Sequence, residues 1–255
     1  MNRESYIAVF DSGVGGVSVL GELRALCPGE RFYYFGDSAN APYGRKTTDE
    51  VRALTLAAGR KLLVDRDCKA LVVACNTATA AAITDLRAAY PDRIIVGIEP
   101  ALKLAADLHP SGCIGVMATE VTLREEKFDS LMHRCGDGCS VEKIPAPGLV
   151  ELIESGRRDS EETMAFLHRL LDPYAGRLDA LVLGCTHYPF VKRNIQTVLG
   201  PGTEIVHGGQ GTARETERRL KEAGLLHSGP GEVMILNSAE NDALLKLSWE
   251  LLQAR

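Results

Sequence analysis

The stretch that decides the fold is ALVLGCTHYP, residues 180–189. Its first four residues are apolar, as in a strand that is buried on both faces of a sheet, and a glycine then leads to Cys185 and two further polar residues. A similar stretch, ALVVACNTAT, occupies residues 70–79 and has Cys75 at the equivalent position, 185 − 75 = 110 residues earlier. Each stretch predicts a buried strand followed by a thiol.

Along the whole chain, short apolar runs alternate with longer segments in which apolar residues recur every three or four positions. The apolar runs are residues 6–10, 31–35, 70–74, 93–98, 112–117, 140–144, 180–184, 203–206 and 232–236. Continuous apolar strands separated by helices are typical of a mostly parallel sheet that is covered on both faces. We therefore predict an α/β fold.

The sequence also contains a faint internal repeat. IAVFDSG at 7–13 resembles IGVMATE at 114–120, an offset of 114 − 7 = 107 residues that is close to the offset of the cysteine stretches. Chance similarity between apolar strands is the alternative explanation for so short a match. We interpret the repeat as two similar parallel-sheet α/β domains, with residues 1–97 and 208–255 forming the first and residues 98–207 inserted into it as the second.

The composition is that of an ordinary soluble globular protein, with 45% hydrophobic and 25% charged residues in a chain of 255. A net charge of −5 argues against nucleic acid or an anionic membrane as a partner, because both favour a basic excess. No apolar run approaches the roughly 20 residues of a membrane-spanning helix, and the N-terminal sequence leaves no room for a signal peptide. We expect a cytoplasmic protein whose seven scattered cysteines stay reduced.

Polar clusters follow four of the predicted strands. These clusters are Asp11-Ser12-Gly13, Cys75-Asn76-Thr77, Thr119 to Thr122, and Cys185-Thr186-His187. In open α/β sheets, ligands bind beyond the carboxyl ends of the strands. If the two domains face each other, the four clusters converge on one cleft, where we expect the active site.

The chemistry of the cysteines follows from their context. Cys75 and Cys185 each precede a predicted helix start, with Thr77 or Thr186 as a candidate cap, and a helix N-terminus favours the thiolate. A small buried residue is the alternative for either cysteine alone, but the matching contexts favour reactive thiols. Two opposed thiols suit symmetric acid–base chemistry, in which one thiolate takes a proton from carbon and the opposite thiol returns one.

Two other patterns are less specific. The glycine-rich turn DSGVGG (11–16) lacks the spacing of nucleotide-binding motifs, so it is either a site for a carboxylate at a helix N-terminus or a tight turn without a ligand. The group His133, Cys135 and Cys139 offers only three of the four ligands of a structural zinc site. We therefore expect no bound metal.

Five motifs occur in order along the chain: VFDSGVGG, GDSANAPYG (36–44), VACNTAT, PGLVELIE (147–154) and LGCTHYP. Together they resemble the motifs of the glutamate racemases, cofactor-independent enzymes that supply D-glutamate for peptidoglycan. The resemblance implies two α/β domains with the active site in the cleft between them. It also implies L- and D-glutamate as substrates and no cofactor.

The resemblance further implies roles for individual residues. Cys75 and Cys185 are the two catalytic bases, one for each enantiomer. Asp11 and His187 assist them, and Glu151 lies near the second cysteine. Substrate contacts are expected from Asp11, Ser12, Tyr43, Gly44, Asn76, Thr77, Thr119, Thr122, Thr186 and His187.

One departure from the family pattern and several alternatives stay open. Family members usually carry an Asp-Ser pair where this chain has His207 and Gly208, which puts domain closure or substrate fit in doubt. The chain could instead racemise aspartate or another amino acid. A third alternative is binding of a partner protein, since some relatives are reported to inhibit DNA gyrase, although nothing in the sequence encodes such an interface. A homodimer is also left open.

Overall fold

The computed structural model describes residues 2–98, 101–124 and 138–254. The chain forms two compact units: unit 1 comprises Met1–Glu99 and Gly209–Arg255, and unit 2 comprises Pro100–Gly208.

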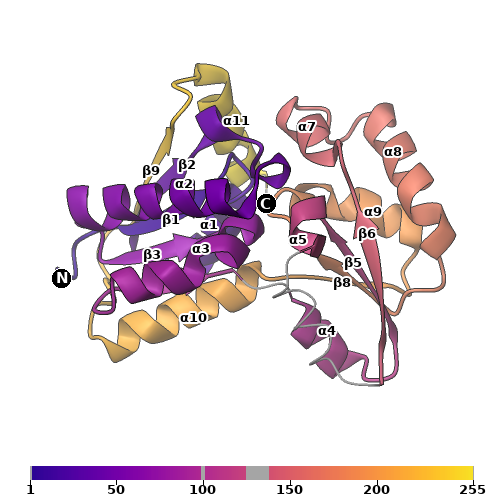
Figure 1. The fold of residues 1–255 in the computed structure, drawn as a ribbon, viewed down its shortest axis with the longest axis horizontal. Coiled ribbons are helices and arrows are strands. Elements are labelled where there is room, and N and C mark those ends of the chain that lie inside the picture. The colour runs from indigo at the N-terminus through magenta and orange to yellow at the C-terminus, as the bar shows by residue number, and fades with distance from the viewer. Residues whose placement is uncertain (1, 99–100, 125–137, 255) are drawn as a thin grey trace. The chain divides into compact units, whose positions relative to one another are not determined.

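Each unit is built on one sheet of parallel strands flanked by helices (Figure 1). In unit 1 the order is β4-β3-β1-β2-β9, with strands β1 (Ile7–Asp11), β2 (Arg31–Gly36), β3 (Ala70–Val73), β4 (Ile94–Gly97) and β9 (Glu232–Asn237). In unit 2 the order is β6-β5-β7-β8, with strands β5 (Cys113–Ala118), β6 (Ser140–Pro145), β7 (Ala180–Leu183) and β8 (Glu204–His207). The predicted α/β fold with two parallel sheets is confirmed.

Helices connect the strands, as parallel pairing requires. In unit 1 they are α1 (Val17–Leu26), α2 (Thr48–Arg60), α3 (Asn76–Ala89), α10 (Gly209–Glu222) and α11 (Asp242–Gln253). In unit 2 they are α4 (Leu102–Leu108), α5 (Glu120–Arg124), α7 (Leu149–Glu154), α8 (Glu161–Leu171) and α9 (Lys192–Leu199). The shorter helical turns are η1 (Ser38–Asn40), η2 (Tyr43–Arg45), η3 (Lys61–Asp65), η4 (Asp172–Tyr174) and η5 (Tyr188–Val191).

The faint sequence repeat corresponds to a repeated strand register. In unit 1, Ile7 of β1 lies opposite Ala70 of β3, and in unit 2, Ile114 of β5 lies opposite Ala180 of β7. The strand order β4-β3-β1-β2 of unit 1 is also that of β8-β7-β5-β6 in unit 2. The two cysteine strands therefore occupy equivalent places, each next to the first strand of its own sheet, where the strand order reverses and α/β folds bind ligands.

Helices bury both faces of each sheet. Alternate side chains of β1, including Phe10, pack with residues of α2 and α3, while α1, α10 and α11 cover the other face (Figure 1). In unit 2, Met117 and Leu183 pack with α7, α8 and α9, whereas Val116 and Val182 pack with α4 and α5. This two-sided burial explains why the strands are apolar without alternation.

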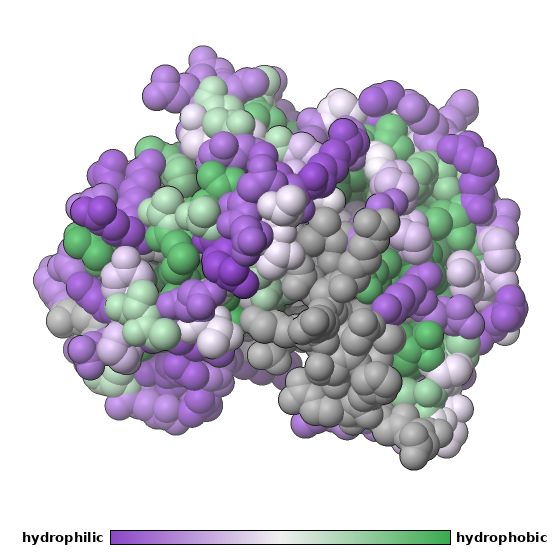
Figure 2. Space-filling view, in the orientation of Figure 1, coloured by the Kyte–Doolittle hydropathy of each residue, from purple (hydrophilic) through white to green (hydrophobic). Residues whose placement is uncertain are grey.

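Hydrophobic side chains on the surface are dispersed. On the face shown in Figure 2 they are scattered among hydrophilic ones. Among the described residues, the large hydrophobic ones with exposed side chains are Leu26, Val64, Leu104, Leu108, Met234 and Trp249. Within the described part of the chain, no helix is both long and apolar enough to cross a membrane.

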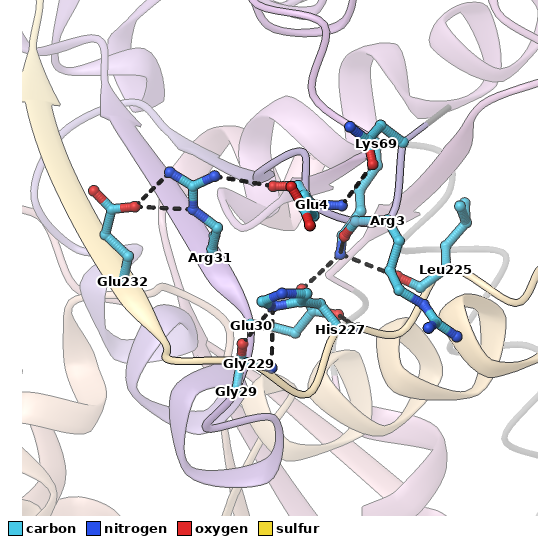
Figure 3. A network of polar contacts seen from close by, with 11 residues as sticks. Arg3, Glu4, Gly29, Glu30, Arg31, Lys69, Leu225, His227, Gly229 and Glu232 are labelled. Atoms are coloured by element: carbon cyan, nitrogen blue, oxygen red, sulfur yellow. Dashed lines mark hydrogen bonds and ion pairs between the residues drawn. The ribbon is translucent and has the colours of Figure 1, made fainter.

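A buried ion pair joins four segments of unit 1 at the amino ends of its strands (Figure 3). Lys69 precedes β3 and Glu30 precedes β2, and their side chains are fully buried with Nζ 2.6 Å from Oε2. Lys69 also donates to the backbone oxygens of Arg3 at 2.6 Å and Leu225 at 3.0 Å. The other oxygen of Glu30 accepts the backbone N–H of His227 at 2.8 Å. The ammonium group thus has all three of its donors satisfied.

We expect Lys69→Met to lower the free energy of unfolding of unit 1 by about 3–5 kcal/mol, because it leaves the carboxylate of Glu30 buried without its cation. Adding Glu30→Gln removes that charge and should recover part of the loss. The single tryptophan, Trp249, lies in α11, so urea denaturation followed by tryptophan fluorescence reports on unit 1. A loss below about 1 kcal/mol for Lys69→Met would contradict the structural role of the pair.

Candidate functional site

Cys75 lies at the carboxyl edge of the unit 1 sheet and caps a helix. It is the N-cap of α3, and its Sγ accepts a hydrogen bond from the backbone N–H of Ala78 at 3.4 Å. The thiol also donates to Oγ of Ser12 at 3.5 Å. The partial positive charge at the start of a helix favours negative charge on this sulfur. The cap is thus the cysteine itself rather than Thr77, the candidate from the sequence.

Asp11 ends β1, the strand next to β3, and its side chain is buried. Its Oδ2 accepts the backbone N–H of Gly13 at 2.9 Å. Gly16 lies so close that a Cβ atom there would be 2.6 Å from Cβ of Asp11, which accounts for a glycine at this position. The turn after β1 therefore wraps around the carboxylate of Asp11.

The other predicted substrate residues of unit 1 lie at the same edge of the sheet. Asn76 and Thr77 are buried in the first turn of α3. Tyr43, in η2, is buried in the same apolar cluster as Cys75. The carboxyl edge of β1, β2 and β3 thus carries Asp11, Ser12, Tyr43, Gly44, Asn76 and Thr77.

In unit 2, three side chains form a chain of polar contacts behind the second cysteine. The Sγ of Cys185 lies 3.7 Å from Nδ1 of His187, and Nε2 of His187 lies 2.8 Å from Oε1 of Glu154. Burial opposes charge on His187, but the contacts with Cys185 and Glu154 raise its pKa well above the usual value. The arrangement therefore favours an imidazolium beside the sulfur.

Glu154 belongs to this cluster of polar contacts, although the sequence did not single it out. It lies in PGLVELIE, the motif from which Glu151 was chosen, and it ends α7 three residues later. Residues three apart share a face of a helix, so this spacing could have added Glu154 as a second candidate beside Glu151. Glu151 lies in α7, which packs against η5. Burial and then the charges of Cys185 and Glu151 raise the pKa of Tyr188, in η5, well above its usual value.

The remaining residues predicted in unit 2 lie at the carboxyl edge of its sheet. Thr119 follows β5, and its Oγ1 lies 3.0 Å from Oγ1 of Thr122 in α5. Thr122 and Thr186 are buried. His207, one of the two residues that depart from the family pattern, ends β8 opposite Leu183 of β7.

The backbone takes a different course after each of the two cysteines. α3 begins directly after Cys75, as predicted. After Cys185, however, the chain forms the 3₁₀ turn η5, and α9 begins only at Lys192. Pro189 accounts for the delay, since proline has no N–H to donate and is suited only to the first turn of a helix. A helical turn does follow Cys185, but it is a 3₁₀ turn whose N-cap is His187, so the prediction of Thr186 as the cap is wrong.

The predicted absence of a metal rests on residues that are only partly described. His133 and Cys135 lie outside the described residues. In the rest of the chain, no three His, Cys, Asp or Glu side chains are grouped so that they could hold a metal ion.

Comparisons with known proteins agree with the motifs. The family model described as Asp/Glu/Hydantoin racemase matches residues 16–216. Glutamate racemase of Clostridium perfringens (strain SM101 / Type A) is 47% identical over 256 residues, which cover 99% of this chain and 98% of that protein. The predicted resemblance to the glutamate racemases is confirmed.

Solved structures give the same result. Glutamate racemase from Francisella tularensis in complex with D-glutamate has a TM-score of 0.86 at 26% identity and covers 98% of this chain and 94% of that chain. Escherichia coli glutamate racemase in complex with L-glutamate and the activator UDP-MurNAc-Ala has a TM-score of 0.83 at 30% identity, over 97% of this chain and 95% of that chain.

We expect Glu154→Gln to move the titration of His187 to lower pH, because the variant loses a charge-assisted hydrogen bond to the imidazolium. Histidine ¹H–¹⁵N NMR spectra recorded across pH measure this shift. His168, whose Nδ1 lies 2.8 Å from the carboxylate of Asp172, serves as an internal control that should not move. Identical titration of His187 in both proteins would contradict the role given to Glu154.

Proposed function

Because the chain belongs to the Asp/Glu/hydantoin racemase family, we propose that it is an isomerase that interconverts L- and D-glutamate without a cofactor. The relatives solved with D-glutamate and with L-glutamate support this choice of substrate. The observation that carries the proposal is the equivalent placement of two cysteines, each beyond the strand that pairs with the first strand of its sheet. We further propose that the D-glutamate serves peptidoglycan synthesis in the cytoplasm.

We propose that the two cysteines act from opposite faces of Cα. The thiolate of one cysteine takes the Cα proton, and the electron pair of the broken C–H bond passes into the substrate carboxylate. The thiol of the other cysteine then gives its proton to the opposite face of Cα, which yields the other enantiomer. After this step the first cysteine is a thiol and the second is a thiolate. The enzyme is then ready to convert the product enantiomer back to the substrate enantiomer.

Each half of the proposed site stabilises its thiolate differently. At Cys185, the imidazolium of His187 donates toward the sulfur, and Glu154 keeps that imidazole charged and oriented. At Cys75, the start of α3 supplies the positive potential, and Asp11 is the neighbouring group that can assist proton transfer. Hydroxyl and amide groups of Ser12, Asn76, Thr77 and Thr186 are suited to binding the carboxylates and amine of glutamate.

The function is tested by incubating the protein with L-glutamate or D-glutamate after dialysis, without pyridoxal phosphate, and following optical rotation by circular dichroism. We expect the signal to decay to zero from either enantiomer. Aspartate in place of glutamate should decay far more slowly. Persistent optical activity with glutamate at high protein concentration would contradict the proposed activity, and faster decay with aspartate would change the substrate.

The same assay separates the catalytic thiols from the others. We expect Cys75→Ser and Cys185→Ser each to lower kcat by about 10²–10⁴-fold, the range typical of a lost general acid or base. Cys113→Ser is the matched control, because Cys113 begins β5 at the opposite edge of the unit 2 sheet from Cys185. Near-normal turnover by either of the first two variants would remove that cysteine from the mechanism.

A further inference from the structure

A carboxylate outside the predicted site lies at the centre of a hydrogen-bond network at the carboxyl edge of unit 1. Asp37 directly follows β2, and its backbone N–H donates to the backbone oxygen of Asp11 at 2.9 Å. Its side chain is almost fully buried. The carboxylate of Asp37 thus lies beside the turn that carries Asp11 and Ser12, although no step of the proposed mechanism uses it.

Three side chains donate hydrogen bonds to this carboxylate. The hydroxyl of Tyr43 donates to Oδ2 at 2.7 Å, and the hydroxyl of Ser238 donates to Oδ1 at 2.7 Å. The amide of Asn40 donates to both oxygens, at 3.0 and 3.1 Å. An ionised carboxylate only accepts hydrogen bonds, so three converging donors match it, and they connect η1, η2 and the segment after β9 through one residue.

The network reaches the predicted substrate residues through Tyr43. The ring of Tyr43 packs against that of Phe10 with centroids 6.4 Å apart, in the same apolar cluster as Cys75. Burial and then the hydrogen bond to Asp37 raise the pKa of Tyr43 far above its usual value, so its hydroxyl stays a donor. Because the hydroxyl of Tyr43 donates to Asp37, we expect the ligand to contact Gly44 and the backbone of this turn instead.

A second link fixes the same turn to the C-terminal strand. Oγ of Ser238 accepts the backbone N–H of Ala39 at 3.0 Å, and the amide of Asn237 donates to Oγ of Ser38 at 2.6 Å. Residues 237–238 follow or end β9, about 200 positions after η1 in the sequence. The C-terminal strand therefore holds the turn in place through side chains.

We propose that Asp37 is a positioning residue for substrate binding, which fixes the Tyr43–Gly44 turn to β9 through the hydroxyls of Tyr43 and Ser238. This inference rests on the proposed racemase function. Small displacements of a binding group can cost up to about 100-fold in activity. The effect of losing Asp37 therefore falls mainly on KM rather than on the proton transfers.

The test is the kinetics of Asp37→Ala with glutamate. We expect kcat/KM to fall about 10- to 100-fold, with most of the change in KM. Asp37→Asn keeps an acceptor for Ser238 and should recover part of the loss. Tyr43→Phe and Ser238→Ala should change KM in the same direction, and less than additively when combined with Asp37→Ala, because all three break one network.

Glu30→Gln is the matched control. Glu30 and Asp37 are buried acids at opposite ends of β2, so both variants disturb unit 1, but only Asp37 lies at the carboxyl edge. We expect KM to be unchanged in Glu30→Gln, with folding of every variant checked by Trp249 fluorescence.

KM within twofold of wild type in Asp37→Ala overturns the inference, as does an equal rise of KM in Glu30→Gln. If Asp37→Ala does not fold, unchanged KM in both Tyr43→Phe and Ser238→Ala overturns it. Absence of racemisation by the wild type rejects the proposed function instead.

Discussion

The register between neighbouring parallel strands is the constraint on which the rest of the structure depends. Ile7 opposite Ala70 and Ile114 opposite Ala180 fix where each cysteine leaves its sheet. Since side chains alternate along a strand, a shift of one residue would turn every side chain of the strand to the other face. The position of each cysteine is therefore fixed by an apolar strand that is buried on both faces. The polar residues that follow it need only a short turn to lie at the carboxyl edge of the same sheet.

The two units share this geometry but stabilise negative charge by different means. Unit 1 places Cys75 at the start of a 14-residue helix, where the backbone N–H of Ala78 donates to the sulfur. Unit 2 has a short 3₁₀ turn after Cys185 and instead supplies a buried histidine backed by a carboxylate. The positive potential of the helix start comes from the backbone and does not change with pH. The support of Cys185, in contrast, depends on the proton of His187. The proposed acid–base pair is thus symmetric in its thiols and asymmetric in its electrostatic support.

The sequence was sufficient to predict the class of fold and the repeated cysteine strands, because both depend on local apolar runs and their spacing. It could not distinguish Glu154 from Glu151, since both lie on one short helix and the choice depends on where α7 packs. The sequence did not indicate the contact between Asp37 and Ser238 either, because it depends on tertiary packing and joins positions 201 residues apart. The cap after Cys185 was mispredicted because Pro189 delays the α-helix, an effect that the surrounding residues could have revealed.

The central claim, that two separate thiols serve the two faces of Cα, is tested most directly by racemisation in D₂O. Starting from unlabelled L-glutamate, early time points analysed by chiral chromatography and mass spectrometry give the deuterium content of each enantiomer. Two bases predict that the D-glutamate formed carries deuterium at Cα while the remaining L-glutamate does not. Deuterium that enters the L-glutamate pool as fast as D-glutamate forms would show a single base that returns protons to both faces, and would contradict the account.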